Sequence, residues 1–206
     1  LKSLTWSQES DIVKITANYS LSVGAEYTLH YTLTGENQLK VEADYHPISS
    51  DIPLMPKFGM RMRIPADFKQ IKWYGRGPWE NYPDRKLSAK VGWYELPIEE
   101  FQTDYARPQD NGNRCDVRWL TLSSGRHALK VEGSQPLCVR AWDYGEEDLE
   151  QVKHHYELPH GQFVNLNLDL NIHGVGGIDT WGARTMDKYT LDGNRPYSYS
   201  FVLTYE

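Results

Sequence analysis

An unbroken alternation of apolar and polar side chains over residues 163–173 narrows the fold more than any other feature of this chain. Val164, Leu166, Leu168, Leu170 and Ile172 alternate with Asn165, Asn167, Asp169, Asn171 and His173. Successive side chains of a strand point to opposite faces of its sheet. The pattern therefore predicts a strand with one buried apolar face and one amide-rich face.

The same period of two recurs along the chain and predicts further strands, at residues 13–19, 26–33, 39–45, 58–65, 69–74, 117–123, 127–132, 137–142 and 197–206. Turn signals such as Asp192-Gly193-Asn194 separate them. A single segment, 148–157, is expected to be helical. There Asp148 would cap the first turn, and Leu149, Val152 and Tyr156 follow helical spacing. We therefore expect one all-β domain, residues 1–206, built as a large sandwich of antiparallel sheets.

Composition and charge argue against some classes of function. The 206 residues carry 22 Lys and Arg against 28 Asp and Glu, a formal net charge of −6, whereas binding mainly to nucleic acid needs a basic surface. No apolar run has the length needed to cross a bilayer. We expect neither a nucleic-acid nor a membrane partner. The first residues show no secretory leader, but the chain opens at Leu1 without an initiator Met, so the compartment stays open between cytoplasm and periplasm.

Three long polar loops carry the motifs of this chain, and irregular loops on a sheet scaffold are where function usually lies. They read GRGPWENYPDR over 75–85, RPQDNGNR over 107–114 and GVGGIDTWGAR over 174–184. In their order and spacing these strings resemble the C-terminal "small chain" domain of bacterial β-galactosidases of glycoside hydrolase family 2. Thr180 stands at a motif position where Ser is also common.

The resemblance covers the whole chain and implies a galactose mutarotase-like antiparallel supersandwich that lacks its first strands. It implies that the complete enzyme cleaves terminal β-galactosides, such as lactose, with retention of configuration. Both catalytic Glu residues, Mg and a monovalent cation would then belong to a separate (β/α)₈ barrel of the same polypeptide. The isolated chain is accordingly expected to be inactive and to contain no catalytic residue, no metal site and no cofactor.

The third loop supplies the expected substrate-binding residues. On the residues alone, Trp181 is either a buried anchor or a ring that stacks on a ligand. The resemblance implies stacking on the sugar in the aglycone subsite, with Asp179 and Arg184 as further candidate contacts. An indole face covering about 100 Å² of sugar C–H surface would contribute about 2 kcal/mol before ordering costs.

The polar residues of the other two loops are expected to order those loops rather than to react. The predicted scaffold residues are Glu80, Asn81, Asp84, Arg85, Arg107, Asn111 and Arg114. Glu80, Asp84, Asp110 and Asp179 each lie within a few residues of an Arg, and hydrogen bonds between them are the economical explanation. Catalysis of glycoside cleavage would need a matched pair of carboxyl groups.

Two other functions remain as alternatives. A free-standing carbohydrate-binding module would bind galactosides without a barrel. A mutarotase-type epimerase would need a His and a carboxylate that converge on the concave face, for which His173 and Asp169 are the candidates. The sequence also leaves open whether Cys115 pairs with Cys138 and whether the chain forms a homo-oligomer.

Overall fold

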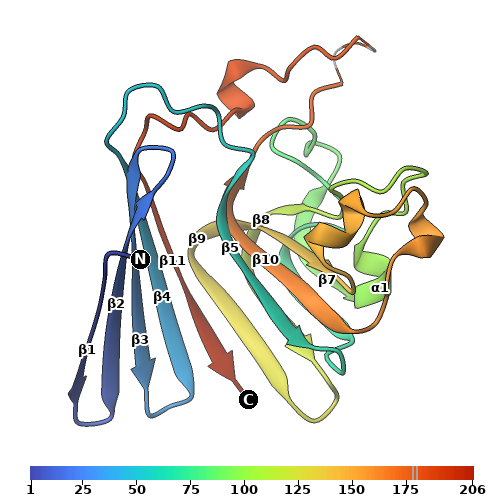
Figure 1. Cartoon of the computed structure of the whole chain (residues 1–206). Helices are drawn as coiled ribbons and strands as arrows, with labels where there is room; N and C mark the ends of the chain where they lie inside the picture. Colours follow the sequence, from blue (N-terminus) through green and yellow to red (C-terminus); the bar gives the residue numbers. More distant parts are fainter. Residues whose placement is uncertain (178, 180) are drawn as a thin grey trace.

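The computed structural model describes residues 1–177, 179 and 181–206 and is mostly antiparallel β (Figure 1). The strands are β1 (Ser3–Glu9), β2 (Ile12–Leu21), β3 (Ala25–Thr34), β4 (Gln38–Pro47), β5 (Lys57–Pro65), β6 (Gln70–Gly77), β7 (Lys90–Pro97), β8 (Arg114–Ser123), β9 (Ala128–Trp142), β10 (Phe163–Ile172) and β11 (Tyr197–Tyr205). The one α-helical turn among the described residues is α1 (Ile98–Phe101). Thr180, singled out in the third motif, lies outside these residues. No described helix is both long and apolar enough to cross a membrane.

All of these strands join one continuous sheet that folds over on itself. Its main path runs β1-β2-β3-β4-β11-β9-β8-β6-β7, and β10 pairs with both β9 and β5. β9 joins the two halves, because residues 129–133 pair with β11 and residues 138–142 pair with β10. Figure 1 shows β1–β4 and β11 on one side and the remaining strands on the other.

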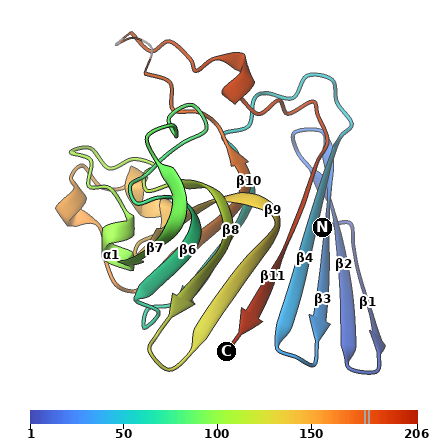
Figure 2. The same cartoon turned by 180° about the vertical axis from the view of Figure 1, so that it is seen from behind.

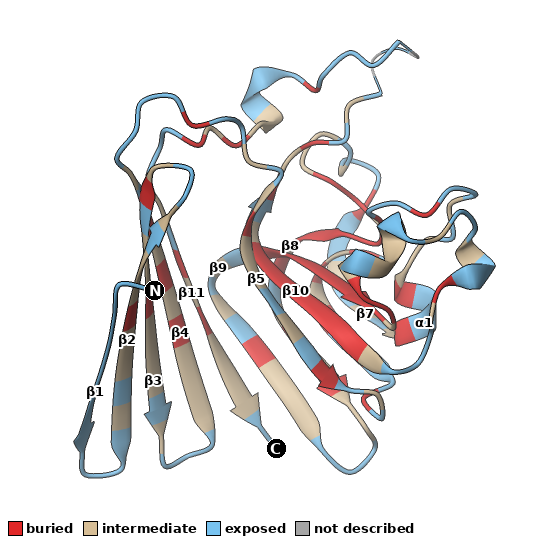
Figure 3. Ribbon diagram, in the orientation of Figure 1, coloured by how far each residue is buried: buried red, intermediate tan, exposed pale blue. Residues whose placement is uncertain are grey.

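The main core lies between the folded halves and draws residues from both. The alternation over 163–173 behaves as predicted on its apolar side, since Leu166 and Leu168 are fully buried. The amide-rich side of β10 is buried as well, because Asn165, Asn167 and Asp169 are each 1% exposed. Figure 3 shows β10 as a continuously buried strand, whereas β1 is exposed along its whole length.

The predicted strands are all present, with three differences. β1 was missed because it carries just two large apolar residues, Leu4 and Trp6, and both are exposed. β7 was missed because large apolar side chains occupy both of its faces and blur the alternation. Segments 127–132 and 137–142 form the single strand β9, since the four residues between them bulge while the strand continues.

The predicted helix at 148–157 is instead two short 3₁₀ turns, Glu146–Glu150 and His155–Glu157. Leu149 and Val152 do pack inward on the Trp142 cluster, but Tyr156 is exposed. The acidic residues are placed by ion pairs to β5 rather than by a helix dipole, because Glu146 contacts Lys57 and Arg61, and Glu147 contacts Arg61.

Candidate functional site

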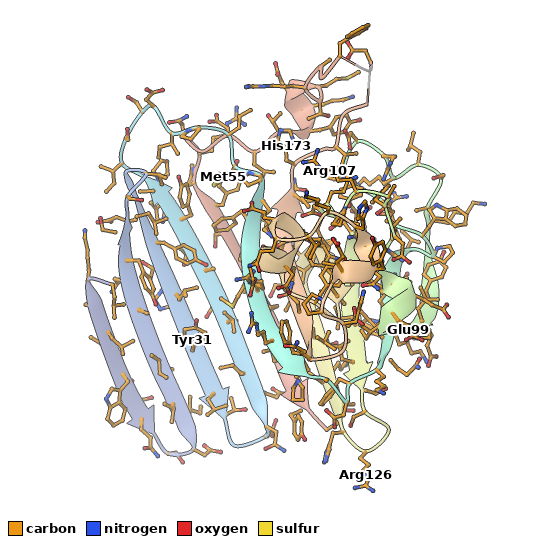
Figure 4. All side chains as sticks on the ribbon, turned by 45° about the vertical axis from the view of Figure 1, so that its right-hand side comes forward. Tyr31, Met55, Glu99, Arg107, Arg126 and His173 are labelled. Carbon is orange, nitrogen blue, oxygen red and sulfur yellow. The ribbon has the colours of Figure 1, made fainter. Side chains whose placement is uncertain are left out.

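The three motif loops gather at one end of the sheet. In Figure 4, Arg107 of the second loop and His173, at the start of the third, lie at this end, whereas Arg126, in the turn between β8 and β9, lies at the opposite end. The strand order explains the arrangement, since β8 pairs with β6 on one side and with β9 on the other, and β9 pairs in turn with β10.

Asp84 of the first loop binds the third loop across a separation of about ninety residues. Its Oδ1 accepts a hydrogen bond from the Val175 amide at 3.0 Å, and its Oδ2 accepts from the Gly176 amide and the Thr185 hydroxyl, both at 2.8 Å. Burial acts to raise the pKa of Asp84, but these hydrogen bonds outweigh it and hold the pKa below its usual value. The carboxylate therefore stays ionised at neutral pH and fixes both ends of the third loop.

Gly174 permits this close approach. A Cβ at this position would lie 2.6 Å from the Asp84 carboxyl carbon and 2.8 Å from the Thr185 hydroxyl oxygen, which is inside van der Waals contact. The first glycine of the third motif, Gly174, is therefore required because the Asp84 carboxylate packs against its backbone.

Asp179 and Trp181 form the tip of the third loop. The Asp179 Oδ1 accepts hydrogen bonds from the Trp181 amide at 2.8 Å and from the Ala183 amide at 3.2 Å. The Trp181 residue is 91% exposed. Arg184 is also exposed, and the structure gives Asp179 these backbone partners rather than the neighbouring arginine expected from sequence.

Glu80 joins the first loop to the second. Its Oε2 accepts from the Gly112 amide at 2.9 Å, and its Oε1 accepts from Arg85 at 2.6 Å and from the Tyr105 hydroxyl. The Glu80–Arg85 pair is the predicted kind of loop-ordering contact.

Three buried polar side chains hydrogen-bond to the backbone at the bases of these two loops: those of Asn81, Asn111 and Arg114. The Asn81 side chain accepts from the Cys115 amide at 2.9 Å, and the Asn111 side chain accepts from the Thr103 amide at 2.9 Å. Arg114 is 2% exposed and donates to three carbonyl oxygens, those of Pro78, Phe101 and Gly112, at 3.0, 3.1 and 2.9 Å. All three residues therefore have the structural contacts of a scaffold.

Asp110 contacts an arginine that the sequence reasoning did not single out. It pairs with Arg140 of β9, not with Arg107 or Arg114. The Arg140 guanidinium is fully buried and also faces Glu146 at 3.2 Å and Asp169 at 3.4 Å. Burial raises the pKa of Asp169 to about 6, although Arg140 opposes that shift.

A polar pocket of about 720 Å³ opens beside this ion-pair cluster. Arg107 of the second loop lines it, together with Asp110 and Glu146. Arg140 and Thr185 were the contact residues most easily missed, since neither belongs to a repeated or charged local pattern. The one local signal for Thr185 is its position directly after the third motif, which ends at Arg184.

Cys115 and Cys138, whose pairing was open, are buried free thiols with sulfur atoms 3.7 Å apart. Among the residues that the structure describes, no group of three or more His, Cys, Asp or Glu side chains is placed to hold a metal ion. His173 and Asp169 have separate partners, since the His173 ring bonds to the Gly174 carbonyl and Asp169 faces Arg140.

The fold places this chain in a class of antiparallel supersandwiches. A galactose 1-epimerase from Lactobacillus acidophilus superposes with a TM-score of 0.58 over 98% of this chain and 65% of that one, at 10% sequence identity. A likeness at so low an identity shows a shared fold and carries no information on activity.

Sequence comparison identifies the family. The model of the β-galactosidase small chain matches residues 1–203, and the chain belongs to this family. A β-galactosidase of Priestia megaterium is 37% identical over 98% of this chain and 20% of its own length. One of Vibrio cholerae is 34% identical over 99% of this chain and 19% of its own length. The chain thus spans about a fifth of the length of these relatives.

Proposed function

We propose that the polypeptide carrying this chain is a retaining β-galactosidase in which Trp181 forms an aromatic wall of the aglycone subsite. The observation that carries the proposal is the Trp181 residue, 91% exposed on a loop whose backbone is held by Asp84 and Asp179. Large aromatic side chains are usually buried, so an exposed one whose backbone amide is held by Asp179 suits contact with another surface or ligand.

The proposed contribution is binding rather than bond cleavage. An indole face over sugar C–H groups contributes about 2 kcal/mol before ordering costs, and the loop hydrogen bonds reduce those costs by fixing the backbone in advance. Asp179 belongs to the proposal as the residue that orients the loop tip. Arg184, which is exposed and follows Trp181 by three residues, is a candidate contact to a sugar hydroxyl.

The reacting groups are proposed to belong to other parts of the polypeptide. The carboxylates Glu80, Asp84, Asp110 and Asp179 are each engaged in hydrogen bonds or ion pairs with this chain's own groups. We assign the catalytic acids, and Mg with a monovalent cation, to the catalytic barrel, and we expect the 206 residues alone to hydrolyse no galactoside.

Replacement of Trp181 in the complete enzyme tests the assignment. Trp181→Ala should lower kcat/KM for lactose about tenfold, and should lower it less for an aryl galactoside, because the ring contacts the leaving group and not the reacting carbon. Trp181→Phe should recover part of the loss. Trp6→Ala is the matched control, since Trp6 is 71% exposed on the remote edge strand β1.

Two results would refute the proposal. One is an equal loss for lactose and aryl galactosides in Trp181→Ala, which indicates a folding role. The other is hydrolysis of a nitrophenyl galactoside by the purified 206-residue chain. No observation favours the epimerase alternative, because the groups it would use, His173 and Asp169, bond to other partners.

A further inference from the structure

A cluster of aromatic rings lies on the outer face of β6, β7 and β8, away from the motif loops. Trp93 of β7, Tyr74 of β6 and Trp119 of β8 are cross-strand neighbours in one row. Figure 2 shows the three strands side by side, on the half of the molecule opposite to β1–β4. Trp93 is 67% exposed, whereas Tyr74 and Trp119 are half-buried.

The neighbouring rings hold Trp93 in place. Its ring centroid lies 4.9 Å from that of Trp119, in an edge-to-face contact, and 5.5 Å from that of Tyr74. Such aromatic contacts stabilise one arrangement of the rings beyond what burial alone provides. An exposed ring that is already ordered loses little conformational entropy when a ligand binds it.

Acidic, basic and hydroxyl side chains, all able to form hydrogen bonds, occupy the next row of the same face. Glu95, Lys72, Thr121 and Lys130 are cross-strand neighbours there. Together with Trp93 and Trp119 they line a groove of about 530 Å³. Lys130 also pairs with Glu132 at 2.9 Å, and Glu206 lines the groove as well, so two lysines face three carboxylates there.

This combination fits one class of ligand. The excess of one carboxylate disfavours an anion, and donors and acceptors beside an aromatic ring suit a molecule with hydroxyl groups and an apolar face. The exposed aromatic area is about 200–300 Å², whereas a stable protein interface takes about 800 Å² from each partner. The face is therefore better matched to a saccharide than to a second copy of the chain.

We propose that the outer face of β6–β8 is a second saccharide-binding site, which takes a neutral pyranose oligosaccharide. One pyranose ring stacks on Trp93, and hydroxyl groups of the next ring meet Lys72, Glu95 and Thr121. The site is separate from the Trp181 loop and does not depend on the proposed enzymatic function.

The test uses the complete polypeptide labelled with 5-fluorotryptophan and titrated with cellotetraose, which carries no terminal galactose. The ¹⁹F resonance of Trp93, assigned by its loss in Trp93→Phe, should shift saturably with a millimolar or lower Kd. Trp93→Ala should raise the Kd about tenfold or more, and Trp93→Phe should raise it less. Lys72→Met should raise it several-fold.

Two control variants separate this site from general contacts of tryptophan with sugars. Val91→Ala changes an exposed residue of the same strand and face, and Trp6→Ala removes an exposed indole elsewhere. Both should keep the Kd within about twofold. Trp181→Ala should also leave it unchanged, so failure here and failure of the proposed function are distinct results.

The proposal is overturned if the Trp93 resonance does not move at about 10 mM cellotetraose, or if Trp93→Ala binds as tightly as the parent. It is also overturned if Trp93→Ala reduces the molecular mass of the assembly in solution, because that result would show the face covered by a second copy.

Discussion

Removal of the Asp84 carboxylate should release the Trp181 loop while leaving the sandwich folded. Asp84→Ala deletes three hydrogen bonds, from the Val175 amide, the Gly176 amide and the Thr185 hydroxyl. Hydrogen bonds to a charged group contribute about 1.5–3 kcal/mol each in mutational series. They share one partly exposed carboxylate and are not additive, so we expect local stability to fall by about 2–4 kcal/mol.

Amide hydrogen exchange measures that loss directly. A fall of 2–4 kcal/mol corresponds to exchange that is about 30- to 900-fold faster at Val175 and Gly176, with β9 and β10 unaffected. Asp84→Asn, which keeps one acceptor oxygen but no charge, should lie in between. Gly174→Ala should mimic Asp84→Ala, since its Cβ would lie 2.6 Å from the carboxyl carbon. Asp187→Ala, at an exposed carboxylate three residues beyond the third loop, is the control.

The reasoning is refuted if both amides exchange at the parent rate in a folded Asp84→Ala variant. It is also refuted if loss of protection spreads evenly over the sheet, because that would make Asp84 a determinant of global stability rather than of one loop. In the complete enzyme, Asp84→Ala should weaken lactose use in the same direction as Trp181→Ala, with a smaller effect.

Two further predictions concern ionisation. The pKa of Asp84 is depressed in the folded loop, so the stability that its carboxylate gives the loop is present above the ordinary aspartate pKa of about 3.9 and is lost as the pH falls through the lower folded value. Amide exchange at Val175, followed from pH 6 to pH 3, should show protection lost at the acid end. Protection that stays uniform relative to β10 would contradict this prediction. Arg140→Met removes the cation beside the buried Asp169 and should destabilise β9 and β10 by about 3–5 kcal/mol. Because burial already raises the Asp169 pKa to about 6, that loss should be greater at pH 8 than at pH 5, where the carboxyl group is protonated. Thermal unfolding at both pH values measures the loss of stability. The double variant Arg140→Met with Asp169→Leu should recover most of that stability, and no recovery would contradict the view that the loss comes from leaving Asp169 unpaired.

Much of the architecture follows from local pattern. Alternation over 163–173 predicts β10, and the same period predicts most of the other strands, because a strand exposes its two faces to different surroundings at every second residue. It fails at β7, where Trp93 and Tyr94 place aromatic rings on opposite faces. β7, one of the two strands not predicted, carries Trp93, the most exposed ring of the proposed saccharide face.

The contacts of the loops were less predictable than their location. Proximity in sequence correctly suggested Glu80 with Arg85, five residues apart. The same argument was wrong for Asp84 and Asp110, whose partners lie on segments far away in the sequence. A long-range contact depends on which strands become neighbours and in what register, and no window of local sequence contains that information.

The amino-acid sequence by itself determined that the chain is antiparallel β, that three motif loops carry its polar residues, and that it resembles the β-galactosidase small chain. The tertiary structure alone decided that Asp84 binds the third loop, that Trp181 is exposed, and that Trp93 and Trp119 meet over β6. The alternation of apolar and polar side chains is set by residues that are adjacent in the chain, whereas loop contacts and surface clusters form only when folding brings distant strands together.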